Sequence, residues 1–243
     1  MADEYGPGGE RFKRHSAWRW PVYIAIGIAI IGAALLAYYF RPNLGDITGT
    51  NPNFTAETKP VHARIAGTGF TIPANYTRIP QHRAGGDLDE VSLHALLPQL
   101  APYTMDTAAE FDNVSAPASR VVFLRIHRNK TPYDEAARFQ NLLSSIENPD
   151  GAPGPHGLTA YTFNPVPAYA NNDLYTGADG RGGTAVIRCT RETTDDPAPA
   201  CLRDVDLGPG LAYSYQFKRA WLADWREIDA RAWSLVQKFR SAP

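Results

Sequence analysis

The chain has 243 residues, with 24 basic and 25 acidic side chains, a formal net charge of -1 and 44% hydrophobic residues. These proportions are those of an ordinary globular protein, and they exclude the collagen-like and low-complexity classes. The nearly balanced charge, without a long basic tract after residue 41, gives no indication of a nucleic-acid partner.

An uninterrupted apolar run covers residues 21–40 and contains no charged residue, His, Asn or Gln. A bilayer core of roughly 30 Å requires about 20 apolar residues in a helix. Aromatic side chains, which favour the headgroup region, lie at both ends of the run. They are Trp18, Trp20 and Tyr23 on one side, and Tyr38 and Tyr39 on the other. The sequence therefore predicts one transmembrane helix at 20–41, which contacts the lipid bilayer through residues 21–40; a buried core helix is the alternative.

Basic residues are concentrated before the apolar run, and they are Arg11, Lys13, Arg14 and Arg19. The positive-inside rule then places residues 1–19 in the cytosol and the chain after residue 41 outside it. The prediction is a single-pass signal-anchor protein of a bacterial inner membrane with a periplasmic domain. A cleaved signal peptide is the alternative, although its apolar region is usually only about 7–15 residues long.

The segment 42–60 is rich in Pro, Gly, Asn and Thr and has no apolar period, which predicts a flexible tether. The remaining residues, 61–243, are sufficient for one domain with its own hydrophobic core. The domain opens with two short apolar stretches on either side of Gly67 and Gly69, which predict a hairpin.

Three further elements are predicted before residue 128. Apolar residues alternate with other residues at 91–97, which favours a strand, with a helix as the alternative. The segment 107–112 predicts a short helix. The segment 120–127 is rich in β-branched residues and predicts a central strand.

Thr131, Pro132 and Asp134 form a helix-start pattern, with a hydroxyl cap followed by proline at the first helical position. They predict a helix that runs to about Ile146. Pro and Gly residues at 148–157 then predict an exposed loop. Two short strands are expected after it, at 158–163 and 172–176.

Three extended runs follow, at 184–189, 201–207 and 211–217, and they predict an antiparallel meander. Cys189 and Cys201 bracket a polar, Pro-rich stretch, so they face each other if the first two runs pair. Outside the cytosol such a pair predicts a disulfide. Two cysteines without nearby histidines are a poor zinc pattern, and their spacing is unlike Cys-x-x-Cys.

The chain ends in a predicted amphipathic helix whose apolar stripe should cover the sheet. The stripe consists of Leu222, Trp225, Ile228, Ala232, Leu235, Val236 and Phe239. Trp221 and Trp233 lie off its centre, and we take them as a candidate interaction surface.

Four residues are candidate ligand contacts: His94, Arg125, His127 and Arg128. His94 is near acidic residues in the sequence, and the basic residues around His127 form a cluster that suits an anionic ligand. The sequence has no phosphate-binding loop, no Gly-x-Ser-x-Gly elbow and no histidine pair in the domain at i,i+4. We therefore assign no catalytic residue, no metal and no cofactor from the sequence.

The predicted fold is α+β, with an antiparallel sheet covered by helices, including the amphipathic C-terminal helix. The predicted function is that of a non-enzymatic, membrane-anchored module or accessory subunit that binds another membrane or envelope protein. The first alternative is a membrane-tethered hydrolase or small-ligand-binding protein that uses His94, His127 and nearby acids. The second is that the anchor helix is itself the interface.

Overall fold

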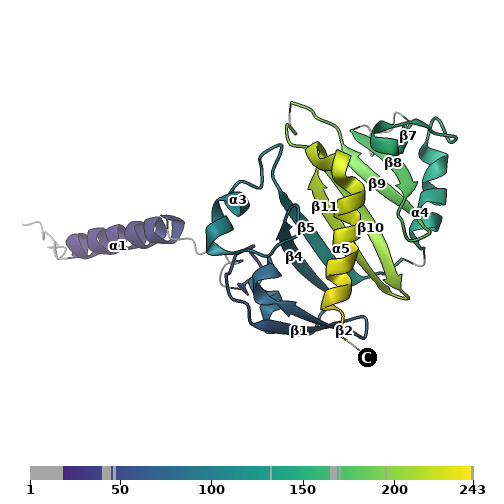
Figure 1. Ribbon diagram of the computed structural model, residues 1–243. Helices are drawn as coiled ribbons and strands as arrows, with labels where there is room; N and C mark the ends of the chain where they lie inside the picture. The colour runs from purple at the N-terminus through teal and green to yellow at the C-terminus, as the bar shows by residue number, and fades with distance from the viewer. Residues whose placement is uncertain are drawn as a thin grey trace, which may run out of the picture. The chain divides into compact units, whose positions relative to one another are not determined.

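The computed structural model describes residues 19–39, 45, 48–131, 133–164, 169, 171–194 and 196–241, and Figure 1 shows the course of the chain. It divides into two compact units, Met1–Ile47 and Thr48–Pro243, which are described separately below. The predicted cytosolic segment lies outside the described residues except for Arg19.

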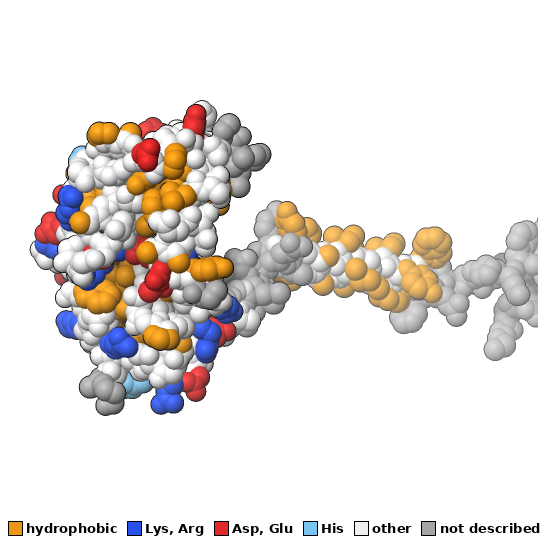
Figure 2. Space-filling model, turned by 90° about the vertical axis from the view of Figure 1, so that its right-hand side faces the viewer, with side chains coloured by type: hydrophobic (Ala, Val, Ile, Leu, Met, Phe, Trp, Pro, Cys, Tyr) orange, Lys and Arg blue, Asp and Glu red, His pale blue; other side chains and the backbone are white. Residues whose placement is uncertain are grey.

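The first unit contains one described helix, α1 (Arg19–Tyr39), which covers most of the predicted apolar run. Its large side chains are exposed, with Trp20 73% and Ile28 67% accessible, and Figure 2 shows hydrophobic side chains along the helix. Across the described residues, no helix meets the length and hydropathy expected of a membrane span. The predicted transmembrane helix at 20–41 is therefore not supported, and Phe40 and Arg41 of that range lie outside the described residues.

The second unit is a mixed α+β fold built on an eight-stranded antiparallel sheet in the order β4-β5-β11-β10-β9-β8-β7-β6. Its strands are β4 (Glu90–Leu96), β5 (Val121–Arg128), β6 (Ala152–Pro153), β7 (Thr159–Tyr161), β8 (Asn172–Ala178), β9 (Thr184–Thr190), β10 (Ala200–Gly208) and β11 (Leu211–Lys218). The meander predicted from the sequence is formed by β9, β10 and β11 in consecutive antiparallel order.

A second, three-stranded sheet contains the predicted hairpin. β1 (Pro60–Ile65) pairs antiparallel with β2 (Thr68–Pro73) across a turn at Ala66 and Gly67, while β3 (Gly86–Asp87) pairs parallel with β1. Gly67 has a φ of +83°, a conformation that glycine adopts without steric cost.

The C-terminal helix α5 (Trp225–Phe239) lies across one face of the large sheet, as Figure 1 shows. The 3-10 turn η6 (Arg219–Asp224) leads into it from β11. In β11 the alternate residues Leu211, Tyr213, Tyr215 and Phe217 are at most 2% exposed, and they belong to the same core cluster as the predicted helix stripe. The period of 2 in the strand and of 3.6 in the helix therefore bury matching apolar surfaces.

Two smaller hydrophobic clusters lie on the opposite face of the large sheet. At one end, Leu96 and Val121 pack with Phe111 of α3 (Ala108–Asp112). At the other end, Leu174 and Val186 belong to a cluster with residues of α4 (Glu135–Leu142) and the 3-10 turn η4 (Leu143–Ser145). The sheet is thus covered by α5 on one face and by a helix near each end of the other.

The folded unit begins earlier than the predicted domain boundary at residue 61. Phe54 packs against the α3 cluster and stacks on Tyr103 with ring centroids 5.3 Å apart. The backbone N–H of Asn53 donates to the carbonyl of Arg78 at 2.9 Å. The described residues 48–59 are therefore held by the domain, while most of the remaining predicted tether, 42–44 and 46–47, lies outside the described residues.

The helix predicted at 131–146 is shorter in the structure. Asp134 is its N-cap and accepts a hydrogen bond from the backbone N–H of Ala137 at 2.8 Å. Thr131 does not cap it, because its hydroxyl donates to Asn129 Oδ1 at 2.8 Å. The acidic side chain displaced the hydroxyl as the cap because aspartate is at least as good an N-cap as threonine.

The predicted disulfide between Cys189 and Cys201 is confirmed. The two residues are register partners in β9 and β10, and both are fully buried in the main core. Arg188 and Leu202 form the only other register pair between these two fully described strands, so the disulfide stands at the point where β9 and β10 begin to diverge.

Candidate functional site

His94, a predicted ligand contact, is a buried residue and not a surface histidine. Its exposure is 0%, and its ring meets those of Phe54 and Phe111 edge-on with centroids 5.1 and 5.0 Å apart. Among the described residues, neither ring nitrogen has a partner with hydrogen-bond geometry, although the backbone of Asn75 lies close enough to favour the charged ring. Burial above all, with smaller contributions from the charges of Arg83 and Arg78, lowers the pKa of His94 to about 4.

The other three predicted ligand contacts lie on β5, and each is paired with an acid. Arg125 is 3.6 Å from Glu90, Arg128 is 3.2 Å from Asp89, and His127 Nε2 is 3.8 Å from an oxygen of Asp204. The last contact is too long for a hydrogen bond. Because an acid lies beside each of the three side chains, the cluster does not present the unpaired positive charge that an anionic ligand would favour.

The structure does not bring His94 and His127 into one site. His94 is opposite Phe123 in the sheet, and His127 lies four residues farther along β5, opposite Glu90. That separation corresponds to about 13 Å along an extended strand. The two imidazoles therefore cannot act on one substrate atom as acid and base.

A buried ionic cluster, which the sequence did not reveal, lies where β9 and β10 diverge. Arg203 of β10 is 1% exposed and donates to Glu135 of α4 through Nε and Nη2, both at 2.8 Å. It also donates through Nη1 to Asp229 of α5 at 2.6 Å. Arg203 thus joins the two helices that lie on opposite faces of the sheet.

The first turn of α4 fills the gap between the diverging strands. Glu135 Oε1 accepts the backbone N–H of Val186 in β9 at 2.7 Å, and Arg138 donates to the backbone carbonyl of Asp204 in β10 at 3.1 Å. These contacts replace the strand-to-strand hydrogen bonds that β9 lacks before Arg188 and β10 lacks after Leu202. Asp206 further accepts from the backbone N–H of Glu135 at 2.8 Å.

The acids of this cluster are also held by other groups. Asp229, 1% exposed, accepts from Tyr215 at 2.9 Å and from Arg181 at 2.7 Å. Burial raises the pKa of Glu135, although the hydrogen bonds and charge of Arg203 oppose the rise. Burial alone would lower the pKa of Arg203, but Glu135, followed by other charged partners, raises it. The cluster is therefore a network of paired charges suited to holding the fold together.

No group of three or more His, Cys, Asp or Glu residues in the described part of the chain is arranged to hold a metal ion. On the face that carries α4 and β7, acidic, basic and hydrophobic side chains are interspersed, as Figure 2 shows. That face offers no extended surface of a single charge.

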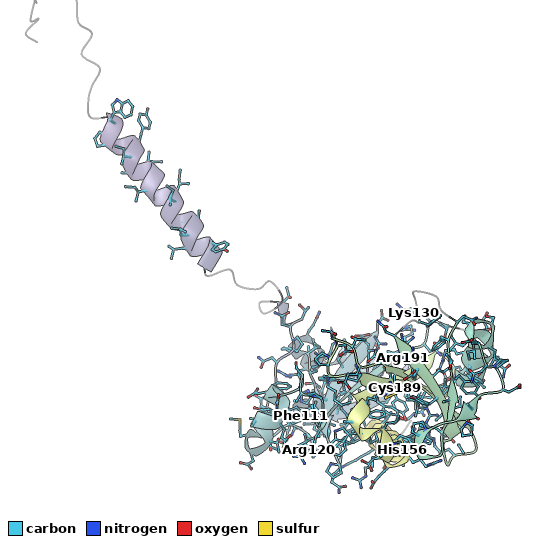
Figure 3. All side chains as sticks on the ribbon, turned by 90° about the horizontal axis from the view of Figure 1, so that it is seen from above. Phe111, Arg120, Lys130, His156, Cys189 and Arg191 are labelled. Atoms are coloured by element: carbon cyan, nitrogen blue, oxygen red, sulfur yellow. A yellow bond between two sulfur atoms is a disulfide. The ribbon has the colours of Figure 1, made fainter. Side chains whose placement is uncertain are left out.

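A small groove lies between the loop after β4 and the start of α5, with a volume of about 260 Å³. We call it the Trp221 groove and define it by its lining residues. They are Leu97, Pro98, Arg120, Trp221, Asp224, Glu227 and Ile228. Leu97 and Ile228 are 4% and 2% exposed and form an apolar floor, while the charged residues form the rim. Figure 3 shows Arg120 on the side of the domain that carries Phe111 and α3.

The walls of the Trp221 groove are fixed by polar contacts. The indole Nε1 of Trp221 donates to the carbonyl of Ser119 at 3.1 Å. Arg231 of α5 donates to the carbonyl of Pro98 and, at 2.8 Å, to the side-chain oxygen of Gln99. A groove whose walls are already held loses little conformational freedom when it is filled.

Trp233, the second predicted interaction residue, does not share this groove. Its ring packs against the main core, and the guanidinium of Arg181 lies 4.8 Å from the ring centroid. Trp233 therefore partners a residue of the ionic cluster, whereas Trp221 lines an open concave site.

The sequence contained a weak signal for the ionic cluster. Arg203 occupies an inward position in the alternation of β10, between Cys201 and Val205. A charge on an apolar face requires a buried counter-ion, since an unpaired buried charge is very costly. Its partners, Glu135 and Asp229, are far away in sequence, so the pairing itself could not be read from the strand.

Comparison with known protein families finds no matching family, and comparison with curated proteins finds no match either. Among solved structures, the chain is similar to Smlt3025, an immunity protein of the Stenotrophomonas maltophilia type IV secretion system, with a TM-score of 0.55 and 20% identity over 76% of this chain and 94% of that chain. A second match is the Neisseria meningitidis iron-regulated outer membrane lipoprotein FrpD, with a TM-score of 0.47 and 15% identity over 78% of this chain and 96% of that chain. The first likeness establishes a shared fold.

Proposed function

We propose that the domain from residue 48 onward binds another protein and acts as an accessory or protective module of the cell envelope. The observation that carries the proposal is the Trp221 groove, a preformed concave site with an apolar floor and a charged rim. Protein interfaces concentrate their binding energy in such sites, where a buried side chain is surrounded by polar contacts that exclude water.

The fold supports this proposal by analogy. The matched immunity protein is covered over 94% of its length, so this domain contains nearly the whole of that fold. Because one fold can serve unrelated functions, the analogy raises the expectation of a protein partner without identifying it.

The contacts of the predicted ligand residues make the alternative of a hydrolase less favourable. His94 is enclosed by aromatic rings, and His127 faces an acid about 13 Å farther along the sheet. A general base needs a substrate proton within hydrogen-bond reach, which an enclosed ring cannot provide.

The proposed function predicts a stable complex in the native membrane or envelope fraction. The full-length chain is crosslinked in its native cells and extracted in mild detergent, and it should then migrate at the mass of a defined complex. Purification of the partner identified in that complex should in turn recover the full-length chain. A matched control, residues 1–47 fused to an unrelated disulfide-bonded domain, should not recover that partner. If the full chain is always an isolated monomer, the proposed function is wrong.

The proposal also includes the location predicted from the sequence, an extracytoplasmic domain attached to a membrane through residues 21–40. The Cys189–Cys201 disulfide supports an oxidising compartment, and the apolar run with its basic N-terminal flank supports attachment.

Attachment through residues 21–40 predicts that the full chain stays in the membrane pellet after extraction at alkaline pH. Replacing both Ile28 and Ile31 by arginine should release it, since a charge in the hydrocarbon core costs about 2.5–3.5 kcal/mol per residue on insertion scales. Replacing the domain residues Asp112 and Asp150 by arginine is the matched control and should leave the chain in the pellet. Release of the unaltered chain would show that this run does not hold it in a membrane.

A further inference from the structure

The size of the Trp221 groove limits what it can hold. Sites for small molecules and cofactors usually enclose about 300–1,000 Å³, whereas this groove has about 260 Å³ and is open on one side. Its apolar lining consists of Leu97 and Ile228 in the floor and of Pro98 and Trp221 in the walls. A groove of this size and composition suits one apolar side chain that projects from a larger molecule.

The charges on the rim are unevenly compensated. Arg120 is ion-paired with Glu110, and Glu227 is ion-paired with Arg231, so these two rim residues are neutralised by their neighbours. Asp224 is exposed at the N-cap position of α5, but its side chain makes no capping hydrogen bond. Within the described part of the chain, no ion pair to Asp224 is present. One negative charge therefore remains on the rim beside the apolar floor.

We propose that the Trp221 groove receives an apolar side chain of a partner protein, with a neighbouring lysine or arginine of that partner paired to Asp224. This inference rests on the proposed protein-binding function and adds the site and the chemistry of the partner. An acidic partner segment would meet the like charge of Asp224, which disfavours it. An uncharged apolar segment would leave the Asp224 carboxylate close to apolar surface without a counter-ion.

The fixed walls make this groove a suitable anchor point for a partner side chain. Trp221 cannot turn into the groove without breaking its hydrogen bond to Ser119, and the Pro98 wall is tied to α5 through Arg231. Tryptophan and arginine are the residue types in which binding energy concentrates at interfaces. The Trp221 groove combines a fixed tryptophan with an acid placed to receive the partner's basic residue.

The test uses a displayed library of random 12-residue peptides selected against the purified full-length chain. Enriched peptides should carry leucine or phenylalanine next to lysine or arginine. Binding of an enriched peptide should weaken at least tenfold with Asp224→Lys, and the peptide with its basic residue changed to glutamate should bind that variant better than it binds the unaltered chain. The matched control is Asp150→Lys, which reverses an exposed acid in a loop outside the groove and should change binding less than twofold.

Because lysine at a helix N-terminus is unfavourable, Asp224→Asn is the second variant. It removes the charge without reversing it and should show an intermediate loss at an unchanged melting temperature. Enriched peptides that lack basic residues, or that bind Asp224→Lys as well as the unaltered chain, would overturn the proposal. The proposal would also be overturned if a second copy of the chain occupied the groove. That result would be seen as a dimer of the full chain that the Asp224→Lys substitution dissociates.

The outcome separates this inference from the proposed function. If the native complex persists in the Asp224→Lys variant and crosslinks through other surfaces, the groove is not the docking site, but the protein-binding function stands. If the unaltered chain forms no complex and selects no peptide, both proposals fail.

Discussion

Replacing Arg203 by methionine is expected to lower the free energy of unfolding by about 3–5 kcal/mol, the cost of removing one partner from a buried ion pair. The substitution leaves Glu135 and Asp229 inside the core without the guanidinium that joins them. It also removes the link between α4 and α5 across the gap between β9 and β10. The measurement is urea denaturation at neutral pH. The slope of the unfolding free energy against urea concentration is fixed at the value found for the unaltered chain.

The matched control is Arg128→Met, which removes an arginine from an ion pair whose side chains are 49% and 73% exposed. Exposed pairs contribute about 0–1 kcal/mol, so this variant should stay close to the unaltered chain. A loss in Arg203→Met no larger than in this control would show that the ionic cluster does not hold the fold.

The pH dependence of Arg203→Met gives an independent check. Burial already raises the pKa of Glu135 in the presence of Arg203, and loss of the guanidinium raises it further. A carboxyl group whose pKa is higher in the folded than in the unfolded state stabilises the fold as the pH falls through the folded value. The variant should therefore recover part of its lost stability, relative to the unaltered chain, as the pH is lowered from 7.

Much of the fold could be predicted because it depends on local patterns. The alternation in β11 and the apolar stripe of α5 each define which face of the element is buried. The spacing of the two cysteines predicts that they face each other on paired strands. The start of α4 was harder to predict, since Thr131 and Asp134 are both good N-caps. In the structure the hydroxyl of Thr131 donates to Asn129, two residues earlier, and Asp134 caps the helix.

The ionic cluster could not be predicted, because it joins residues that are distant in sequence. Arg203 is 68 residues from Glu135 and 26 residues from Asp229. The gap into which α4 fits exists because β9 diverges from β10. No local sequence pattern indicates where two strands stop pairing. The sequence therefore predicted the strands, but not the contact that replaces their pairing.

The burial of His94 was not evident from the sequence, because the alternation at 91–97 suggested a strand with one polar face. The residue alternates with Leu93 and Ala95, which indicated exposure, but α3 and the segment around Phe54 cover this end of the second face. Phe54 was assigned to a flexible tether. The burial of His94 could therefore not be read from its strand, because part of its cover, Phe54, came from outside the predicted domain.

The burial of His94 predicts that the fold is weakened by acid. Its pKa is about 4 in the folded state, below the ordinary histidine value of 6.5, so the unfolded chain binds this proton more readily. The stabilising effect of the neutral ring is fully present above pH 6.5 and is lost as the pH falls to about 4. One pKa unit corresponds to about 1.36 kcal/mol, so the expected loss is about 3 kcal/mol.

The measurement compares the unaltered chain with His94→Phe by urea denaturation from pH 7.5 to pH 4. Phenylalanine keeps an aromatic ring against Phe54 and Phe111 but binds no proton, so the difference between the two curves isolates His94 from the other groups that titrate. This difference should grow in favour of the variant below pH 6.5. The exposed His62→Phe is the control and should not reproduce it.

Parallel curves for His94→Phe and the unaltered chain would mean that the ring reaches solvent or a counter-ion when it is protonated. The aromatic enclosure of His94 would then not keep the charged ring from solvent.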